Sequence, residues 1–278
     1  MTSDAIRFRF GLGSALRATA QRIRHAPGLR ACTGAWNLLR RPYGRMLALL
    51  SGSRGLPLQI GGHVVRLNPK FANLNWETVE VEAYRAFRTS VQPGDVVYDV
   101  GAHFGTYSII SVREGGPRTR VVAYEPCELT RQYLEQHLEW NNAIEQVIVR
   151  EVCCGANSGE ASFFFRPGVP EGINGLLKAE GLVEVPVQVT TLDADVEQIG
   201  LNPSIIKIDV EGAELEVLRG AERVLRTCRP RLFVSLHPGP LAKLGLEPKV
   251  ILQWLRNRDY QCQIIAEDQE LHLMALPN

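Results

Sequence analysis

From residue 96 onward, short apolar runs alternate with stretches in which apolar residues recur three and four positions apart. The first pattern is typical of buried strands and the second of amphipathic helices. Strands are predicted at Val96–Val100, Arg120–Glu125, Gln146–Val152, Ile205–Asp209 and Leu232–Leu236. Helices are predicted between them at Thr106–Arg113, Leu129–Asn141 and Ala213–Arg226. Short apolar strands separated by helices indicate an α/β fold, with a parallel sheet covered on both faces.

The segments that flank this alternation predict hairpins and further helices. They are a hairpin at Leu56–Ile60 and His63–Leu67, a helix at Asn75–Val91, a helix at Pro248–Arg258, and a hairpin at Gln261–Ala266 with Glu270–Ala275. Strand-like runs at Ala161–Phe165 and Val183–Thr190 interrupt the alternation. The glycine-rich stretch Pro167–Gly181 lies between them, and we expect it to cover the acceptor as a lid.

Basic residues are concentrated at the N-terminal end of the chain. Residues 1–54 hold ten arginines and one acid, a net charge of +9, so the remaining residues carry −8 in a chain of net charge +1. Partial helical spacing predicts that this segment is an Arg-rich helical arm, followed by a main domain over residues 55–278. The arm is either a solvated extension or a transit peptide or membrane-surface helix that makes peripheral membrane contact. The acidic main domain argues against nucleic acid as a partner.

The six cysteines show neither Cys-x-x-Cys spacing nor a Cys/His cluster of zinc type. We therefore expect reduced thiols and no bound metal. No apolar run approaches the length of a membrane-spanning helix, and the N-terminus lacks the order of residue types of a secretory signal. These features predict a cytoplasmic protein.

The first specific motif runs from Val96 to Gly105, where an apolar strand enters a glycine turn and a helix follows. Gly101 permits a positive φ, and Gly105 permits close approach of a ligand to the main chain. A nicotinamide-binding chain would carry Gly-x-Gly-x-x-Gly here. Because Asp99 replaces the first glycine, the turn suits the cationic methionine end of S-adenosylmethionine better than a pyrophosphate. We expect Asp99, Gly101, Ala102 and Gly105 to bind that cofactor.

An acid at the end of the next predicted strand supports the same cofactor. Glu125, followed by Pro126, stands twenty residues after Gly105. An acid at this place can accept hydrogen bonds from both hydroxyls of a ribose. We therefore predict that Glu125 and Pro126 belong to the cofactor site, with Glu125 on the ribose.

Acidic residues also follow the strand that ends at Asp209. Ligands of open parallel sheets bind beyond the carboxyl ends of the strands, so Asp209 and Glu211 are expected to face the cleft. Acids at a helix start also act as caps, and this is the only role expected of Glu214. Lys207, inside the strand, should pair with a carboxylate, because an unpaired buried charge is costly. His237 follows the next strand and reaches the same rim, where a structural and a catalytic role are both open.

At these motifs the chain resembles the FkbM family of methyltransferases. The resemblance covers roughly Pro93 to His237 and rests on the runs 99–102 with Gly105, 125–126, 191–193, 207–214 and 218–222, of which Lys-Ile-Asp-Val-Glu-Gly-Ala-Glu is the most specific. It implies a class I methyltransferase fold, Rossmann-like, with a seven-stranded, mostly parallel sheet and an antiparallel C-terminal hairpin. It also implies S-adenosylmethionine-dependent O-methylation of a hydroxyl on a sugar or other secondary metabolite.

Such a reaction needs a proton acceptor, because an aliphatic hydroxyl loses its proton during attack. His237 is the first candidate for this catalytic base, and Asp209 or Glu211 is the second. The cofactor carries the methyl group, so the protein supplies binding, orientation and electrostatics toward a small hydroxylated acceptor.

Other function classes are less favoured but open. A Rossmann-like NAD-dependent oxidoreductase is disfavoured by Asp99 in the glycine turn. A base-modifying methyltransferase is disfavoured because residues 209–212 replace the Pro-Pro-aromatic signature of amino-group methylation. A non-catalytic cofactor-binding scaffold agrees with the same motifs.

Overall fold

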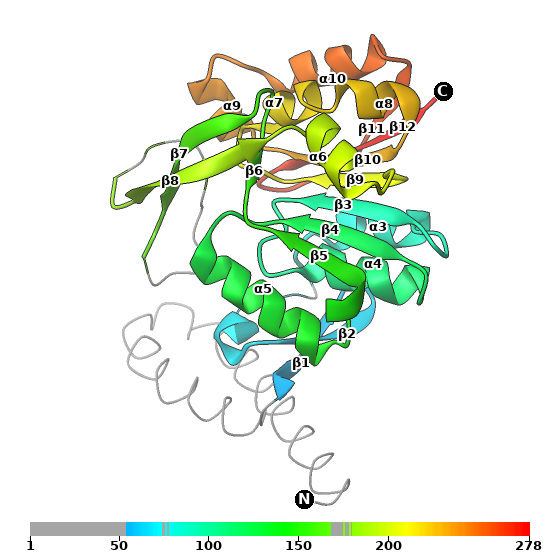
Figure 1. Ribbon diagram of the computed structural model, residues 1–278, viewed down its shortest axis with the longest axis vertical. Helices are drawn as coiled ribbons and strands as arrows, with labels where there is room; N and C mark the ends of the chain where they lie inside the picture. The colour runs from blue at the N-terminus through cyan, green and yellow to red at the C-terminus, as the bar shows by residue number, and fades with distance from the viewer. Residues whose placement is uncertain (1–53, 74–75, 77, 168–174, 176–177, 179) are drawn as a thin grey trace, which may run out of the picture. The chain divides into compact units, whose positions relative to one another are not determined.

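The computed structural model describes residues 54–73, 76, 78–167, 175, 178 and 180–278 (Figure 1). The predicted helical arm and most of the predicted lid lie outside the described residues, so both stay predictions. The chain divides into two compact units, Met1–Val79 and Glu80–Asn278. The predicted boundary after residue 54 also stays a prediction.

In the first unit, β1 (Leu56–Ile60) and β2 (His63–Leu67) form the predicted antiparallel hairpin around the turn at Gly61-Gly62. A short 3-10 helix, η2 (Pro69–Asn73), follows. The indole of Trp76 donates a hydrogen bond to the carbonyl of Phe71 at 2.9 Å, and both residues are buried.

The second unit is built on a seven-stranded sheet of order β11-β12-β10-β9-β3-β4-β5. Its strands are β3 (Val96–Val100), β4 (Arg120–Tyr124), β5 (Val147–Arg150), β9 (Ile205–Ile208), β10 (Arg231–Leu236), β11 (Tyr260–Glu267) and β12 (Leu271–Pro277). β12 pairs antiparallel with both β10 and β11, and the other pairings are parallel. This arrangement confirms the predicted, mostly parallel sheet with an antiparallel C-terminal hairpin.

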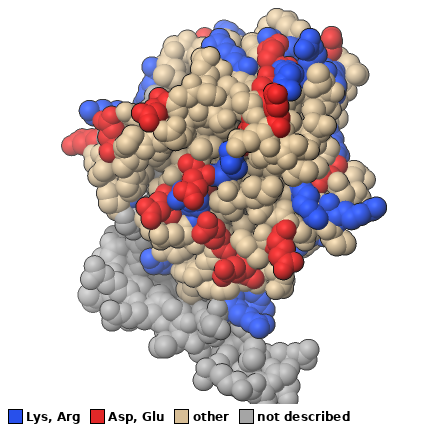
Figure 2. Space-filling view, viewed as in Figure 1, with Lys and Arg blue, Asp and Glu red and all other residues tan. Residues whose placement is uncertain are grey.

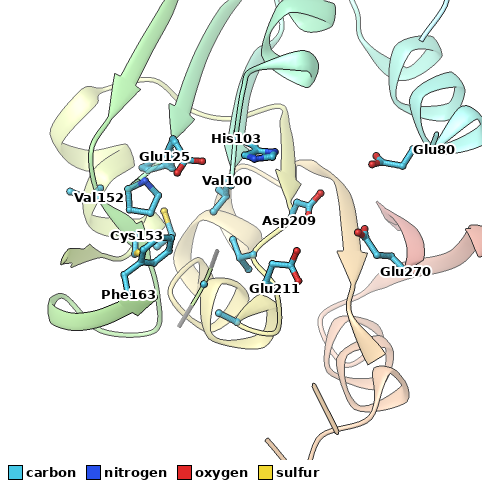
Figure 3. A pocket seen from close by; sticks show the side chains of 17 residues that line it. Glu80, Val100, His103, Glu125, Val152, Cys153, Phe163, Asp209, Glu211 and Glu270 are labelled. Carbon is cyan, nitrogen blue, oxygen red and sulfur yellow. The ribbon is translucent and has the colours of Figure 1, made fainter. Parts of the chain in front are cut away.

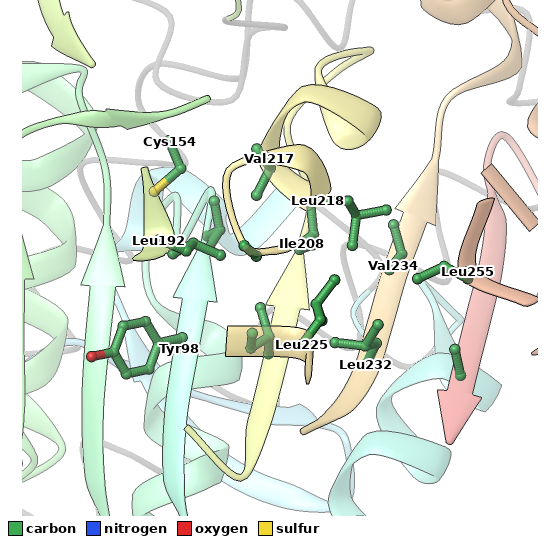
Figure 4. Packing of buried hydrophobic residues seen from close by; sticks show 14 of the residues in the cluster. Tyr98, Cys154, Leu192, Ile208, Val217, Leu218, Leu225, Leu232, Val234 and Leu255 are labelled. Atoms are coloured by element: carbon green, nitrogen blue, oxygen red, sulfur yellow. The ribbon is translucent and has the colours of Figure 1, made fainter. Parts of the chain in front are cut away.

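Helices cover both faces of this sheet. On one face, α4 (Thr106–Gly115) packs against β3 and β4, and α3 (Val81–Ser90) packs against β11. On the other face the main apolar core joins the sheet to α6 (Leu192–Ile199), α7 (Glu214–Arg219), α8 (Glu222–Thr227) and α10 (Pro248–Arg256) (Figure 4). Leu241 of α9 (Pro238–Lys243) joins the same core.

A second, three-stranded sheet stands beside the first in Figure 1. Its strands are β6 (Cys153–Cys154), β7 (Gly159–Phe165) and β8 (Val183–Thr190), in the order β6-β8-β7. Cys153 and Phe163 bury against Cys127, which precedes α5 (Glu128–Trp140), so this sheet has a small core of its own. The two runs that interrupt the predicted alternation therefore belong to a separate sheet.

Two predicted helices differ from the structure for identifiable reasons. The helix predicted from Asn75 begins only at Val81, because Glu80 has a φ of 48°, which an α-helix does not allow. The helix predicted over Ala213–Arg226 is split into α7 and α8. At the split, a Cβ on Gly220 would lie 2.0 Å from the carbonyl oxygen of Gly155, and the Gly220 carbonyl accepts from Asp193 of α6 instead of continuing a helix.

Helices α6 and α9 and the 3-10 helix η3 (Ile144–Gln146) were not predicted. The sequence does carry a start signal for α6, since the Thr191 side chain accepts a hydrogen bond from the backbone N–H of Ala194 at 3.1 Å. Within the described residues, no helix is both long enough and apolar enough to cross a membrane.

The glycine turn after β3 sets the strongest local constraint on the fold. Gly101 has a φ of +79°, and a Cβ there would lie 1.8 Å from the carbonyl oxygen of Asp209. Gly200, which follows α6, has a similar φ of +77° in the left-handed region, but a Cβ there would meet no atom of the described residues within 4 Å. The pair therefore separates the cost of backbone conformation from the cost of steric overlap.

We expect Gly101→Ala to lower the free energy of unfolding by about 3 kcal/mol or more, since overlap adds to the left-handed conformation. Gly200→Ala should cost only about 1–2 kcal/mol. Urea denaturation of the two variants measures the difference. Equal losses would contradict the proposed close contact at Gly101.

Candidate active site

A cavity of about 270 Å³ opens where β3, β4 and β9 end (Figure 3). Because parallel strands present their carboxyl ends on one edge of the sheet, the turns that follow them meet there. Gly101 follows β3, Glu125 and Pro126 follow β4, and Asp209 and Glu211 follow β9; all five line the cavity. Five of the nine predicted site residues are therefore brought together.

The turns after β3 and β9 are held against each other by backbone contacts. The N–H of Asp209 donates to the carbonyl of Val100 at 2.9 Å. The absent Cβ of Gly101 then lets the Asp209 carbonyl approach the glycine turn. On the other side, Gly101 and Ala102 both donate to the carbonyl of Tyr124 at the end of β4.

Asp99 lies beneath this turn and does not line the cavity. Its side chain is buried and accepts a hydrogen bond from the hydroxyl of Ser108 at 2.6 Å. Burial raises the pKa of Asp99 to about 6, against the opposing effects of Ser108 and Lys207. In this structure Asp99 fixes the start of α4 to the strand, and its contact with a cofactor stays a prediction.

Gly105 and Ala102 also lie outside the cavity lining. Gly105 precedes α4 with a φ of +86°, and a Cβ there would meet the side chain of Leu134 at 2.4 Å. The positive φ favours glycine here, and the leucine side chain of α5 packs against the turn. The predicted close approach of a ligand to Gly105 stays a prediction.

Glu125 forms one end of the cavity together with apolar and sulfur-containing side chains. It is 5 % exposed, and it accepts a hydrogen bond from the backbone N–H of Cys127 at 2.9 Å. Burial raises the pKa of Glu125 to about 7, although its backbone donors oppose the shift. In Figure 3, Val152, Cys153 and Phe163 lie beside it. This end therefore combines one acid with a flat apolar surface.

The other end of the cavity is acidic. Asp209, Glu211, Glu80 and Glu270 line it, and Figure 3 shows their carboxylates on the side away from Glu125 and Phe163. Lys207 lies below and donates to Asp209 at 3.0 Å, which confirms the predicted carboxylate partner. Lys207 also donates to the hydroxyl of Ser235 at 2.8 Å. Its ammonium group therefore points toward the carboxyl ends of β9 and β10.

Glu80 and Glu270 are the site residues that the sequence analysis missed. Glu80 precedes α3 in a left-handed conformation and accepts from the hydroxyl of Tyr107 at 2.9 Å. Burial and the nearby charge of Asp209 raise its pKa to about 7. Glu270 stands in the turn between β11 and β12. Neither follows a parallel strand, so only the tertiary structure places them at this edge.

His237 follows β10 and is 5 % exposed, but it does not line the cavity. Its Nδ1 lies 2.6 Å from Oε1 of Glu214. Its Nε2 lies 3.3 Å from Glu270, 3.5 Å from Asp209 and 3.7 Å from Glu211, and none of these contacts has hydrogen-bond geometry. Burial alone would lower the pKa of His237, but Glu214 and the other carboxylates raise it to about 11. A ring that holds its proton so firmly is poorly suited to accept another.

The structure corrects one prediction about the acids of this rim, and it decides against capping by Asp209, which was one alternative. Glu214 was expected only at a helix start, but it is fully buried and binds both the His237 ring and the backbone N–H of Gly212 at 3.0 Å. Asp209 does not cap the next helix, because α7 begins at Glu214 with Ala213 as its N-terminal cap. Glu211 has a φ of 53°, and the turn through Glu211 and Gly212 separates Asp209 from the helix.

The lining of the cavity is strongly one-sided in charge. Five carboxylates line it, from Glu80, Glu125, Asp209, Glu211 and Glu270, and no lysine or arginine is among the described lining residues. On the face shown in Figure 2, by contrast, acidic and basic side chains of the described residues are interspersed. The lining of the cavity is therefore more one-sided in charge than this face, and it suits a cationic ligand better than an anionic one.

Comparison with known proteins gives the family. The family model of the methyltransferase FkbM domain matches residues 99–262, more than half of the chain. This chain belongs to the FkbM methyltransferase family. The matched region contains the glycine turn, Glu125, Asp209, Glu211 and His237, and it confirms the resemblance found in the sequence.

Two curated methyltransferases are similar along much of this chain. The hexuronic acid methyltransferase AglP of Haloferax volcanii is 25% identical over 225 residues, which are 78% of this chain and 87% of that protein. The methyltransferase sdnD of Sordaria araneosa is 27% identical over an alignment of 160 positions, and the match covers 45% of this chain and 60% of that protein.

Among solved structures, the ribosomal protein L11 methylase of Lactobacillus delbrueckii subsp. bulgaricus matches with a TM-score of 0.50 and 15% identity, covering 78% of this chain and 87% of that one. An FkbM methyltransferase of Methylobacillus flagellatus KT has a TM-score of 0.46 and 21% identity, and the match covers 66% of this chain and 43% of that one. Together with the strand order, the first match identifies the fold as the Rossmann-like fold of class I methyltransferases.

Proposed function

We propose that this FkbM methyltransferase uses S-adenosylmethionine to methylate a hydroxyl oxygen on a sugar or a similar small metabolite. The observation that carries the proposal is the cavity beyond β3, β4 and β9, lined by five carboxylates without a lysine or arginine among its described lining residues. The negative potential of these carboxylates attracts a cofactor that carries a sulfonium and an ammonium group. The same potential repels the pyrophosphate of a dinucleotide. The charge therefore favours a methyltransferase over the NAD-dependent oxidoreductase considered from the sequence.

The residues around the cavity fit the parts of this cofactor. Glu125 would accept hydrogen bonds from the ribose hydroxyls, with Pro126 beside it. Val152, Cys153 and Phe163 offer apolar surface for the adenine. The turn at Gly101 and Asp209, which follows β9, would hold the methionine end. Asp99, buried below the turn, would act through its charge and by fixing the turn to α4.

When bound, S-adenosylmethionine supplies a methyl group that is activated by its sulfonium. The protein then has to hold the acceptor oxygen near that methyl and remove its proton. Asp209, Glu211 and Glu270 can accept hydrogen bonds from the hydroxyls of a sugar. Orientation of this kind contributes strongly to such transfers, because it replaces a bimolecular encounter.

Among the three catalytic candidates, we assign proton removal to Glu211 on geometric grounds. Its side chain is 27 % exposed and lines the cavity, where an acceptor hydroxyl can reach it. The His237 side chain is 6 % exposed and is fixed to Glu214 through Nδ1. Asp209 is engaged by Lys207 at 3.0 Å. In this proposal His237 and Asp209 position the rim, and Glu211 meets the acceptor.

The first prediction from this proposal concerns the cofactor. Glu125→Gln should weaken S-adenosylmethionine binding roughly tenfold to a hundredfold, because charged acceptors contribute about 1.5–3 kcal/mol per hydrogen bond. The wild-type affinity should rise as the pH increases through about 7, since the ionised carboxylate accepts from both hydroxyls and the pKa of Glu125 lies at about 7. In Glu125→Gln only a smaller rise, from Glu80 and Glu211, should remain, since burial raises the pKa of both to about 7. Calorimetry at pH 6 and pH 8 measures both effects.

The matched control is Glu128→Gln, which changes an exposed acid at the start of α5 and should leave the affinity unchanged. Tight binding of NAD(H) with no binding of S-adenosylmethionine would refute the proposed cofactor. An unaltered affinity in Glu125→Gln would refute the role of that residue.

The second prediction concerns catalysis. Glu211→Gln should lower the single-turnover rate of methyl transfer by about 10²–10⁴-fold, the usual contribution of a general base, with cofactor affinity nearly unchanged. Transfer of an isotope-labelled methyl group to a panel of hydroxylated sugars and metabolites measures this rate. Glu216→Gln, on the exposed side of α7, is the control.

The opposite result is equally informative. Full activity in Glu211→Gln together with none in His237→Gln would show that His237, and not Glu211, is the catalytic base. Tight cofactor binding without transfer to any acceptor would instead favour the non-catalytic scaffold.

A further inference from the structure

We propose that Asp209, His237 and Glu270 form a binding site for a divalent transition-metal ion at the acidic end of the cavity. No metal was expected from the cysteine and histidine spacing. The three residues are far apart in the sequence, since Asp209 follows β9, His237 follows β10 and Glu270 precedes β12. The existence of this site does not depend on the proposed reaction. Only its use in holding the acceptor rests on the proposed function.

The spacing of the three donor atoms fits metal coordination. One oxygen each from Asp209 and Glu270 and one ring nitrogen of His237 all lie within 4.8 Å of one another. The nitrogen lies 3.5 Å from the Asp209 oxygen and 3.3 Å from the Glu270 oxygen. Ligands bound at about 2.0–2.2 Å lie about 3–3.5 Å apart in tetrahedral or octahedral geometry. The Glu211 oxygen lies 3.7 Å from the same nitrogen and stays outside this group of three ligands.

The second observation is the unpartnered nitrogen of His237. The residue is 5 % exposed, and its buried Nε2 has no hydrogen-bond partner among the described residues while it points toward three carboxylates. Its Nδ1 is held at 2.6 Å by Glu214, a buried carboxylate that is itself fixed by the N–H of Gly212. A histidine that donates one ring N–H to a carboxylate and directs its other nitrogen at further ligands is the usual arrangement of a metal ligand. A bound ion would replace the second proton that the surrounding carboxylates favour on this ring.

The charge balance of this end of the cavity also calls for a cation. Five carboxylates meet there, from Glu80, Asp209, Glu211, Glu214 and Glu270, against the ammonium group of Lys207, which pairs with Asp209, and the ring of His237. Lys207 takes the Oδ2 of Asp209 and leaves its Oδ1 toward His237. The Oε2 of Glu270 is buried, and no described residue forms a hydrogen bond with it. A divalent ion at this point satisfies these oxygens and the ring nitrogen together.

The donor set indicates which ions the site would take. Imidazole favours transition metals, and carboxylates also accept harder ions such as Mn²⁺. One imidazole with two carboxylates therefore suits Mn²⁺ or Zn²⁺. Asp209, Glu211 and Glu270 line the cavity, so a bound ion can also reach a ligand there. It would then hold an acceptor oxygen and make its proton easier to remove.

The test uses the full-length protein after treatment with a chelator and dialysis, without S-adenosylmethionine. Titration with Mn²⁺ alone, followed by calorimetry and by loss of the electron paramagnetic resonance signal of free Mn²⁺, should show one saturable site per chain. Zn²⁺ should displace the bound Mn²⁺. Glu270→Gln should weaken Mn²⁺ binding at least tenfold, since even residues behind metal ligands contribute about 10–100-fold.

Glu267→Gln is the matched control, because it changes an exposed acid at the end of β11 and should bind Mn²⁺ as the wild type does. Circular dichroism melting verifies that both variants fold. Absence of saturable Mn²⁺ and Zn²⁺ binding would overturn the site, as would equal Mn²⁺ affinity in Glu270→Gln and wild type. Cofactor binding, measured separately on the same samples, shows whether the proposed function stands or fails independently.

Discussion

The close backbone contact between the ends of β3 and β9 is the constraint on which the rest of the site depends. Gly101 leaves no room for a Cβ beside the Asp209 carbonyl, and the N–H of Asp209 is bound to Val100. These contacts bring the glycine turn and the acidic turn to one edge of the sheet. The cavity exists because these two turns, distant in the sequence, share this edge, and Tyr124 fixes the third turn beside them through its carbonyl.

The site also imposes a cost on stability. Burial raises the pKa of Asp99 from 3.8 to about 6 and that of Glu125 from 4.5 to about 7. Both pKa values in the folded state lie above those of the unfolded chain. At a pH between the unfolded and the folded value of each acid, the folded state therefore binds more protons than the unfolded chain. Its stability therefore falls as the pH rises through this range, and the full cost is present above the folded pKa. A cationic ligand that favours the ionised carboxylates offsets this cost. The acids that lower the stability of the folded state are therefore the same acids that favour ligand binding.

Much of the fold followed from local pattern in the sequence. The strands from Val96 to Leu236 are short, apolar and bounded by turns, and local periodicity is enough to identify them. The split between α7 and α8 could not be predicted, because it depends on the contact of Gly220 with the backbone of Gly155. The late start of α3 depends on the left-handed conformation of Glu80, which residue type does not reveal.

The candidate site was predictable only where its residues follow parallel strands. Glu125, Asp209 and Glu211 could be placed from strand ends alone, and the structure brings all three to the cavity. Glu80 and Glu270 could not, since one precedes a helix and the other stands in an antiparallel turn. The contact between Glu214 and His237 was missed for a related reason. Each residue has an ordinary local explanation, and only the packing of α7 against β10 joins them.

A crystal structure of the full-length protein with S-adenosylhomocysteine tests the central claim most directly, because the claim concerns which ligand the two ends of the cavity accept. The account predicts ribose hydroxyls on Glu125, adenine against Val152 and Phe163, and the sulfur directed toward Asp209 and Glu211. A nucleoside bound elsewhere, or bound here with its sulfur directed away from these acids, would contradict the account.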